Sequence, residues 1–258
     1  MNKTLTAITL AAGALLAAGI AMTALAAGTD EHGTWTGGRD MIAGSGHVQT
    51  EARNVGSFRA IESHGSMNVV VRQGARVAVE VRADDNLLPL VETSVVDRNG
   101  VPTLQIDTRA HASYHTRNDI VVTVDAVALQ AIGSNGSGDI QVDALKTPAL
   151  KLDMRGSGDV RLKQLDTDDF TVRVAGSSDV QAAGRAGKVT LSIAGSGDID
   201  TAKLEADDVQ VKIAGSGDAS VNAHRTLGVA IAGSGDVTYV GDATVKSSIA
   251  GSGSVSKR

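Results

Sequence analysis

The feature that most constrains the fold is a short repeat, Gly-Ser-Gly-Asp followed by Ile or Val, which recurs through the second half of the chain. Its leading glycines are spaced 18 to 20 residues apart. They are Gly136, Gly156, Gly176, Gly195, Gly215, Gly233 and Gly251. A fixed period of this length is typical of a solenoid, in which each repeat forms one coil that stacks on the previous coil.

Apolar residues at matching positions around each repeat predict a strand on either side of each turn. These positions lie two and four residues before the leading glycine and four residues after it; around Gly215 they are Ile213, Val211 and Ala219. Because side chains alternate between the two faces of a strand, these positions predict one buried face. We therefore predict an all-β protein, a parallel β-helix (β-solenoid) with about 18–20 residues per coil. An antiparallel meander with a hairpin at every repeat is the alternative, but it would not require the same side chains at every turn.

The turn residues of the repeat are expected to be structural. Glycine at the first and third positions indicates positive φ or a close backbone approach, although Ser178 occupies the third position once. The second position is serine in every copy, so stacked coils should form a row of serines. These serines are Ser137, Ser157, Ser177, Ser196, Ser216, Ser234 and Ser252.

The fourth position should form a row of carboxylates, which are Asp139, Asp159, Asp179, Asp198, Asp218 and Asp236, with Ser254 in the last copy. Like charges about 4.8 Å apart repel by about 1 kcal/mol in water, so the row needs compensation. Hydrogen bonds of an Asx-type turn would provide it, and bound Ca²⁺ is the alternative. The repeat occurs only once per coil, unlike the calcium-binding nonapeptide, so we predict Asx turns and no metal.

The chain divides into a leader and one domain. Residues 1–26 are predicted to be a secretory signal, with Lys3, an apolar stretch and a small-residue cleavage site at Ala24-Leu25-Ala26; a retained membrane anchor is the alternative. Residues 27–54 are predicted to be a flexible leader. Residues 55–258 form the domain, with irregular coils over 55–130 and regular coils over 131–258. The signal predicts an exported protein that is periplasmic, outer-membrane-associated or extracellular.

Composition excludes several classes of function. The chain has no cysteine, which excludes disulfides and thiolate chemistry, and its basic residues form no stripe that would favour nucleic acid. His111 and His115 have a metal-ligand spacing but are expected in a polar loop, so we predict no site there. No histidine recurs with the repeated serines. The sequence therefore predicts no catalytic residues, no cofactor and no enzyme activity.

Several segments together carry a family resemblance. They are Phe58 and Ile61, Gln73-Gly74, Asp85-Asn86-Leu87-Leu88, Thr103-Leu104-Gln105-Ile106, and the first repeat from Asn135 to Ile140. With these segments the chain resembles the head GIN domain family of auto-transporter adhesins over about 200 residues. The resemblance implies a right-handed parallel β-helix in a bacterial envelope or secreted protein, with no enzyme activity and no assigned site residues.

The leading functional prediction is a non-enzymatic secreted or cell-envelope protein with a role in adhesion, surface interaction or assembly. One alternative is a lipid- or small-molecule-binding envelope protein, with a groove lined by Leu87-Leu88-Pro89-Leu90. Another is a polysaccharide-acting β-helix enzyme. Its charged residues would be Asp84, Asp85, Arg109, Arg117 and Asp119. Envelope or surface components are the expected partners, together with self-association through the solenoid ends.

Overall fold

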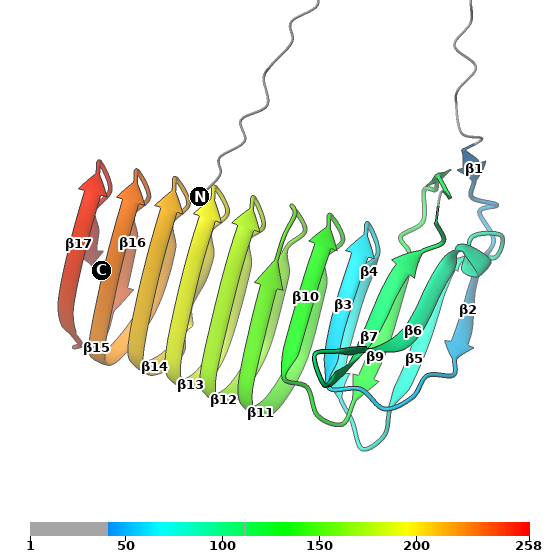
Figure 1. Cartoon of the computed structure of the whole chain (residues 1–258), viewed down its shortest axis with the longest axis horizontal. Helices are drawn as coiled ribbons and strands as arrows, with labels where there is room; N and C mark the ends of the chain where they lie inside the picture. The colour runs from blue at the N-terminus through cyan, green and yellow to red at the C-terminus, as the bar shows by residue number, and fades with distance from the viewer. Residues whose placement is uncertain (1–40, 111) are drawn as a thin grey trace, which may run out of the picture. The chain divides into compact units, whose positions relative to one another are not determined.

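The computed structural model describes residues 41–258 except residue 111. These residues form an all-β, parallel β-solenoid of about six turns, which confirms the predicted fold class (Figure 1). The predicted signal segment, residues 27–40 of the predicted leader and His111 lie outside the described residues. Among the described residues, no helix is long and apolar enough to span a membrane.

The regular coils consist of strands that pair in parallel with their equivalents one coil away. They are β10 (Ala131–Gly136), β11 (Ile140–Met154), β12 (Val160–Gly176), β13 (Val180–Gly195), β14 (Ile199–Gly215), β15 (Ala219–Gly233), β16 (Val237–Val240), β17 (Thr244–Gly251) and β18 (Val255–Lys257). Ile213 on β14, for example, pairs with Ile193 on one side and Ile231 on the other. This parallel pairing excludes the meander.

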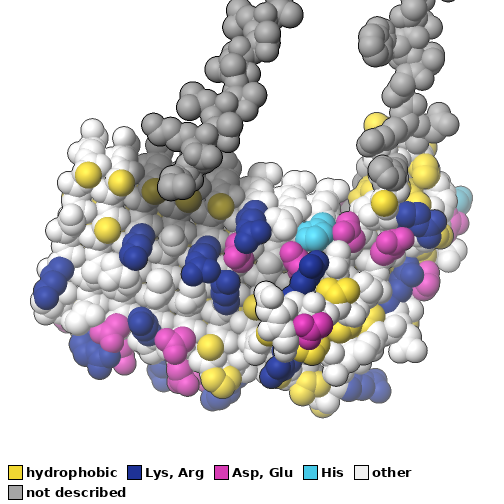
Figure 2. Space-filling view, viewed as in Figure 1, with side chains coloured by type: hydrophobic (Ala, Val, Ile, Leu, Met, Phe, Trp, Pro, Cys, Tyr) yellow, Lys and Arg dark blue, Asp and Glu magenta, His cyan; other side chains and the backbone are white. Residues whose placement is uncertain are grey.

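The interior of the solenoid contains the residues that the alternating pattern assigned to it. Val211 and Ile213 are buried, whereas Lys212 between them is exposed. The last coil differs: within residues 41–258, apart from residue 111, it pairs with a coil on one side only, and its Ser247 and Ile249 are exposed. Figure 2 shows charged side chains of both signs scattered over one outer face.

Coils of 18 to 20 residues stay aligned because the bend opposite the repeat absorbs the difference in length. The pairing register shifts in this bend, for example between Leu162 and Leu165 and between Thr201 and Glu205. The leading glycines therefore remain paired from coil to coil, and the repeat turns line up along one edge (Figure 1).

An additional, degenerate turn lies at the start of this stack. It joins β3 (Ala60–Gly65) to β4 (Asn68–Gln73), and Gly65 pairs with Gly136 of the first recognised copy. The sequence analysis missed this turn because Met67 and Asn68 replace glycine and aspartate, and because it lies far outside the 18- to 20-residue period. The signals that could have found it are the Gly65-Ser66 pair and Val69 four residues after Gly65.

The segment between β4 and β10 forms a coil that is out of order. Its strands β7 (Val101–Thr108) and β9 (Val121–Ala126) pair in parallel with β3 and β4, on the side away from β10 and β11. We call the described residues of the segment 101–126 the inserted coil. The chain thus leaves β4, builds the preceding coil, and returns to continue the stack at β10.

Antiparallel strands, one short parallel pair and a 3₁₀ turn complete this end of the molecule. The remaining elements are β1 (Ile42–Ala43), β2 (Val48–Arg53), β5 (Ala78–Asp84), the 3₁₀ helix η1 (Leu88–Leu90), β6 (Val91–Arg98) and β8 (Tyr114–His115). β6 pairs with β7 through the predicted tight turn, where Asn99 and Gly100 both have positive φ. β2 pairs with β5, so residues 48–53 of the predicted leader are part of the sheet, which begins before the predicted domain boundary at 55.

Replacing Ser178 by glycine should stabilise the protein. Ser178 is fully buried at a turn position that is glycine in the neighbouring coils, and among the described residues its hydroxyl has no hydrogen-bond partner. Glycine increases the entropy of the unfolded chain, which lowers stability, but removing an unsatisfied buried hydroxyl raises stability by more. The free energy of unfolding should therefore increase by about 1 kcal/mol. Urea unfolding measures this gain. Ser177→Gly is the control, because Ser177 is exposed in the same turn; equal destabilisation by both changes would contradict the prediction.

Candidate functional site

The row of repeat turns forms the most regular surface of the molecule. We call it the turn edge, defined by the repeat serines and aspartates from Ser137 to Asp236. All of these serines and aspartates are exposed. Ser178 does not belong to this set, because it occupies the third, glycine position of its repeat, and it is buried. The turns lie side by side along one edge (Figure 1), so each coil places a serine and an aspartate at the equivalent point of its turn.

The glycines let adjacent turns approach one another closely. A Cβ at Gly215 would overlap the carbonyl oxygen of Gly195, and a Cβ at Gly217 would overlap that of Gly197. The first position also has positive φ in five copies, with Gly215 at +146°. Serine N–H groups donate across the same gap, as Ser216 N does to Gly195 O at 3.0 Å. Both reasons that the sequence suggested for glycine are therefore confirmed.

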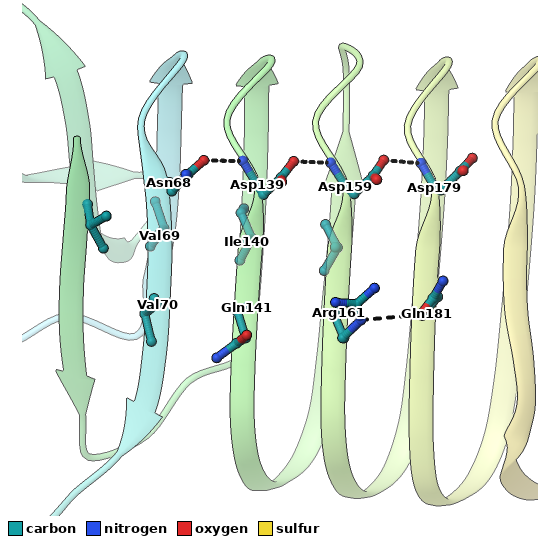
Figure 3. Close-up of a pocket in the computed structure, with 12 residues that line it drawn as sticks. Asn68, Val69, Val70, Asp139, Ile140, Gln141, Asp159, Arg161, Asp179 and Gln181 are labelled. Carbon is teal, nitrogen blue, oxygen red and sulfur yellow. Dashed lines mark hydrogen bonds between the residues drawn. The ribbon is translucent and has the colours of Figure 1, made fainter. Parts of the chain in front are cut away.

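The aspartates are joined by hydrogen bonds that run from coil to coil. In each step, Oδ1 of one residue accepts the backbone N–H of its equivalent in the next coil (Figure 3). The bond from Asp198 N to Asp179 Oδ1 is 2.9 Å long, and the bond from Asp218 N to Asp198 Oδ1 is 2.8 Å long. In the predicted Asx turn, the carboxylate accepts an N–H of its own turn. The observed carboxylate instead accepts an N–H of the next coil, so the predicted partner was wrong although the carboxylate does bond to the backbone.

The row of carboxylates has a defined start and end. Asn68 of the degenerate turn accepts the N–H of Asp139 at 3.0 Å, and Ser254 donates its N–H and its hydroxyl to Asp236. Each N–H dipole stabilises the carboxylate that it contacts, which offsets part of the repulsion along the row. No group of three or more possible metal ligands occurs among the described residues.

A shallow groove of about 310 Å³ runs beside the first part of this row (Figure 3). One side is formed by Asp139, Asp159 and Asp179, and the other includes Arg161 and Gln181. The Arg161 guanidinium donates to Gln181 Oε1 at 3.2 Å. The groove therefore offers an acceptor that recurs in each coil, the aspartate carboxylate, opposite polar side chains that differ between coils.

Of the charged residues named for an enzyme, Asp84 lies against the segment that carries Arg117 and Asp119, but hydrogen bonds from that segment occupy its carboxylate. Asp84 is buried, and its carboxylate accepts hydrogen bonds from Thr116 Oγ1 and Asn118 Nδ2, both at 2.7 Å. These hydrogen bonds lower the pKa of Asp84, and they outweigh burial, which raises it. The carboxylate is therefore ionised and serves to hold the surrounding segment in place. Arg109 instead pairs with Glu92, at 3.3 Å.

The apolar stretch that was expected to line a lipid groove is part of the core. Leu87, Leu88 and Leu90 are all buried in the main hydrophobic cluster. They pack inside the end of the solenoid, so their side chains are not available to line a surface groove.

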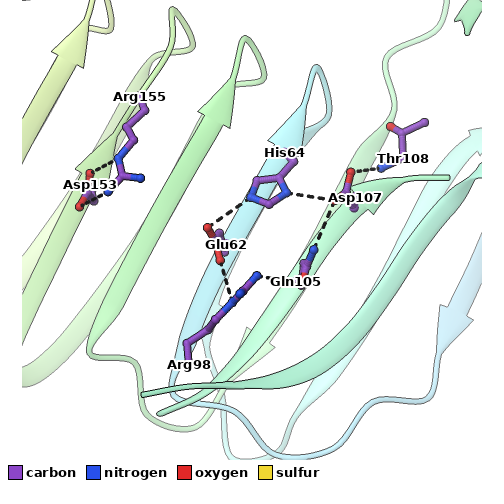
Figure 4. A network of polar contacts seen from close by, with 8 residues as sticks. All are labelled: Glu62, His64, Arg98, Gln105, Asp107, Thr108, Asp153 and Arg155. Carbon is purple, nitrogen blue, oxygen red and sulfur yellow. Dashed lines mark hydrogen bonds and ion pairs between the residues drawn. The ribbon is translucent and has the colours of Figure 1, made fainter. Parts of the chain in front are cut away.

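A polar network that the sequence analysis did not identify lies on β3, β6 and β7 (Figure 4). His64 Nδ1 lies 3.0 Å from Asp107 Oδ2, and His64 Nε2 lies 3.3 Å from Glu62 Oε1. Arg98 Nε is 3.5 Å from Glu62. Burial lowers the pKa of His64, but the contacts with Asp107 and Glu62 outweigh burial and raise the pKa above its ordinary value of 6.5. No local pattern signals this network, because its members come from strands that pair out of sequence order.

Asp198 offers a test of the carboxylate row. Asp198→Asn should change stability by less than about 1 kcal/mol, because the amide oxygen can still accept the N–H of Asp218, as Asn68 does for Asp139. Asp198→Ala removes the acceptor and should lower stability by about 1 kcal/mol. Thermal melts of the three proteins, with and without a calcium chelator, make the comparison.

The chelator should leave all three melting temperatures unchanged if hydrogen bonds alone compensate the row. A ligand that binds only the native state adds its binding free energy to stability. A chelator-induced drop of more than about 10 °C in the unmodified protein would therefore establish bound cations.

Comparisons with known proteins agree with this fold. Residues 57–243 match the family described as "Putative auto-transporter adhesin, head GIN domain". A solved "putative adhesin" from Bacteroides fragilis is 26% identical, with a TM-score of 0.78 over 84% of this chain and 100% of its own. A "putative lipid binding protein" from Parabacteroides distasonis is also 26% identical, with a TM-score of 0.70 over 84% of this chain and 99% of its own. No curated protein matches the chain.

The family match covers well over half of the chain and includes every regular coil except the last. The solved structures extend the likeness to the architecture as a whole, because they are matched over nearly their full lengths. The chain therefore belongs to the head GIN domain family.

Proposed function

We propose that the protein is a non-enzymatic envelope or secreted protein that uses its turn edge as an adhesive or assembly surface. The observation that carries the proposal is the exact repetition of one exposed serine and one exposed aspartate in every coil of that edge. Oδ1 of each aspartate is occupied by the next coil, and Oδ2 has no hydrogen-bond partner among the described residues. Each coil thus offers the same hydroxyl and free carboxylate oxygen to a partner.

Repetition on a rigid support favours binding to an extended partner. A single hydroxyl or exposed carboxylate contributes little by itself, because water competes for the same hydrogen bonds. Several identical contacts at fixed spacing act together, since the first one raises the effective concentration of the others. A solenoid supplies the rigid spacing, because each coil is paired along its length with the next.

The family supports a location at the cell surface or in the envelope. Export through the predicted signal of residues 1–26 is part of the same proposal. It requires a mature N-terminus near Ala27 in periplasmic or extracellular fractions. N-terminal sequencing that found Met1 intact in the cytosol would contradict it.

The experiment measures how much of the purified protein sediments with cell-envelope fragments from its own organism. Two arginines on the turn edge, Ser157→Arg with Ser196→Arg, should reduce binding by about tenfold or more, because long cationic side chains cover the adjacent hydroxyls and carboxylates. The control places the same two arginines on the opposite bend, at the exposed residues Gln164 and His224.

The control should bind like the unmodified protein. Equal binding by both double variants would show that the turn edge is not the contact surface. Envelope fragments that retain none of the unmodified protein would argue against the adhesive function as a whole.

A further inference from the structure

His64 lies where the inserted coil meets the first turn of the stack. It is on β3, whose neighbour β7 belongs to the inserted coil and supplies Asp107. The backbone pairs of this joint run from Ala60↔Thr103 to Ser63↔Ile106 and stop short of His64 and Asp107. The contact between the His64 ring and Asp107 therefore continues the joint beyond the last backbone pair (Figure 4).

Both nitrogens of the His64 ring face carboxylate oxygens. A neutral imidazole has one N–H, so it can donate to only one of Asp107 and Glu62, and its other nitrogen presents a lone pair to the second carboxylate. An imidazolium has two N–H groups and a positive charge, so it attracts both. Asp107 forms a hydrogen bond with Nδ1 at 3.0 Å, whereas Glu62 lies 3.3 Å from Nε2 without hydrogen-bond geometry and attracts the protonated ring by its charge.

The charges around the ring balance only when it is protonated. Glu62 on β3 and Asp107 on β7 are negative, and Arg98 on β6 is positive. The residue paired with His64 on β10 is Asn135, which is neutral, and Arg155, which directly follows β11, is already paired with Asp153, at 3.2 Å. The net charge of His64, Glu62, Asp107 and Arg98 is therefore zero when the ring is an imidazolium and minus one when the ring is neutral.

We propose that His64 is a pH-sensitive latch that fastens the inserted coil to the first turn of the solenoid and loosens when the ring loses its proton. The latch acts on β7 and on β6, which pairs with β7 and supplies Arg98. Loosening it frees the end of β3 and the β6–β7 hairpin, while the regular coils remain paired.

The direction of the pH effect follows from the two titrating groups. A pKa that folding raises above 6.5 adds stability that is fully present below 6.5 and is lost as the pH rises through the pKa of the folded state. Burial raises the pKa of Asp107, but hydrogen bonds from His64, Thr108 and Gln105 outweigh it and lower the pKa. The stability that Asp107 contributes is therefore fully present above pH 3.8, and it is lost only as the pH falls through the lowered pKa of the folded state. The latch is therefore closed at pH values between the pKa of Asp107 and the pKa of His64 in the folded protein.

Hydrogen exchange of the purified protein from pH 6 to pH 9, corrected for the intrinsic rate, tests the latch. Protection of residues 91–108 should fall as the pH rises, by up to about tenfold for each unit by which folding raises the pKa of His64. Protection of residues 180–215 in the regular coils should stay constant and serves as the internal control. In His64→Gln, protection of residues 91–108 should not depend on pH over this range, whereas His224→Gln should behave like the unmodified protein.

An NMR titration of the His64 ring in the unmodified protein provides a second readout that needs no variant. The ring should titrate above the ordinary histidine value of about 6.5. A ring that titrates at or below that value would overturn the proposal. So would unchanged protection of residues 91–108 across the pH range, or the same pH dependence in His64→Gln.

Discussion

Gly215→Ala should destabilise the protein by about 3 to 5 kcal/mol, one of the largest effects of any single methyl group in the chain. The new Cβ would overlap the backbone carbonyl oxygen of Gly195, which is fixed by the same stack of turns. The φ of +146° at Gly215 is also unfavourable for an L-residue. Relief of the overlap requires two paired coils to separate, so strand pairing on both sides is lost.

Gly133→Ala is the matched control for this prediction. Gly133 lies in β10, its φ is not in the positive range, and a Cβ there would be 3.7 Å from the nearest atom, the carbonyl oxygen of Asp153. Alanine in a strand is favoured over glycine by about 0.5 to 1 kcal/mol, so this variant should be as stable as the unmodified protein or slightly more stable. Urea unfolding compares the two, and similar midpoints would mean that adjacent turns are not in close contact.

Ile213→Asp should cost about 3 to 5 kcal/mol, because it places a carboxylate in the apolar interior of the solenoid. Ile213 is 2% exposed and is flanked by Ile193 and Ile231 in the adjacent coils. Neither neighbour can donate a hydrogen bond, so the aspartate must either remain protonated or draw water into the core. Thermal melts should show a large drop in the midpoint.

Lys212→Asp introduces the same side chain one residue away and should be nearly silent. Lys212 is exposed on the outer face, where a carboxylate remains hydrated. Equal losses in the two variants would show that the assignment of residues to the inside and the outside of β14 is wrong.

The sequence alone was sufficient to predict the regular coils. The pairing Ile193↔Ile213↔Ile231 follows from a common position two residues before the leading glycine, because each residue meets its equivalent one coil away. The buried face follows from alternation, which is a local property of a strand. The glycine positions were also predictable, since a turn that must stack on an identical turn leaves no space for a Cβ.

The arrangement of residues 41–130 was decided by tertiary structure. β7 lies beside β3 although β4, β5 and β6 come between them in the chain, and no period marks the two strands as partners. Strand pairing is non-local, so a strand without a repeat carries no local record of its neighbour. The inserted coil and the degenerate turn at Gly65 could therefore not be placed from the sequence.

The same distinction separates the two polar features of the molecule. The serine and aspartate rows could be predicted, because each member repeats with the period of the fold. The hydrogen bond from each aspartate to the next coil could not, since the choice between its own turn and the neighbouring turn depends on the distance between coils. His64, Glu62 and Asp107 meet only because the inserted coil folds back beside β3, so only the tertiary structure brings these three charges together.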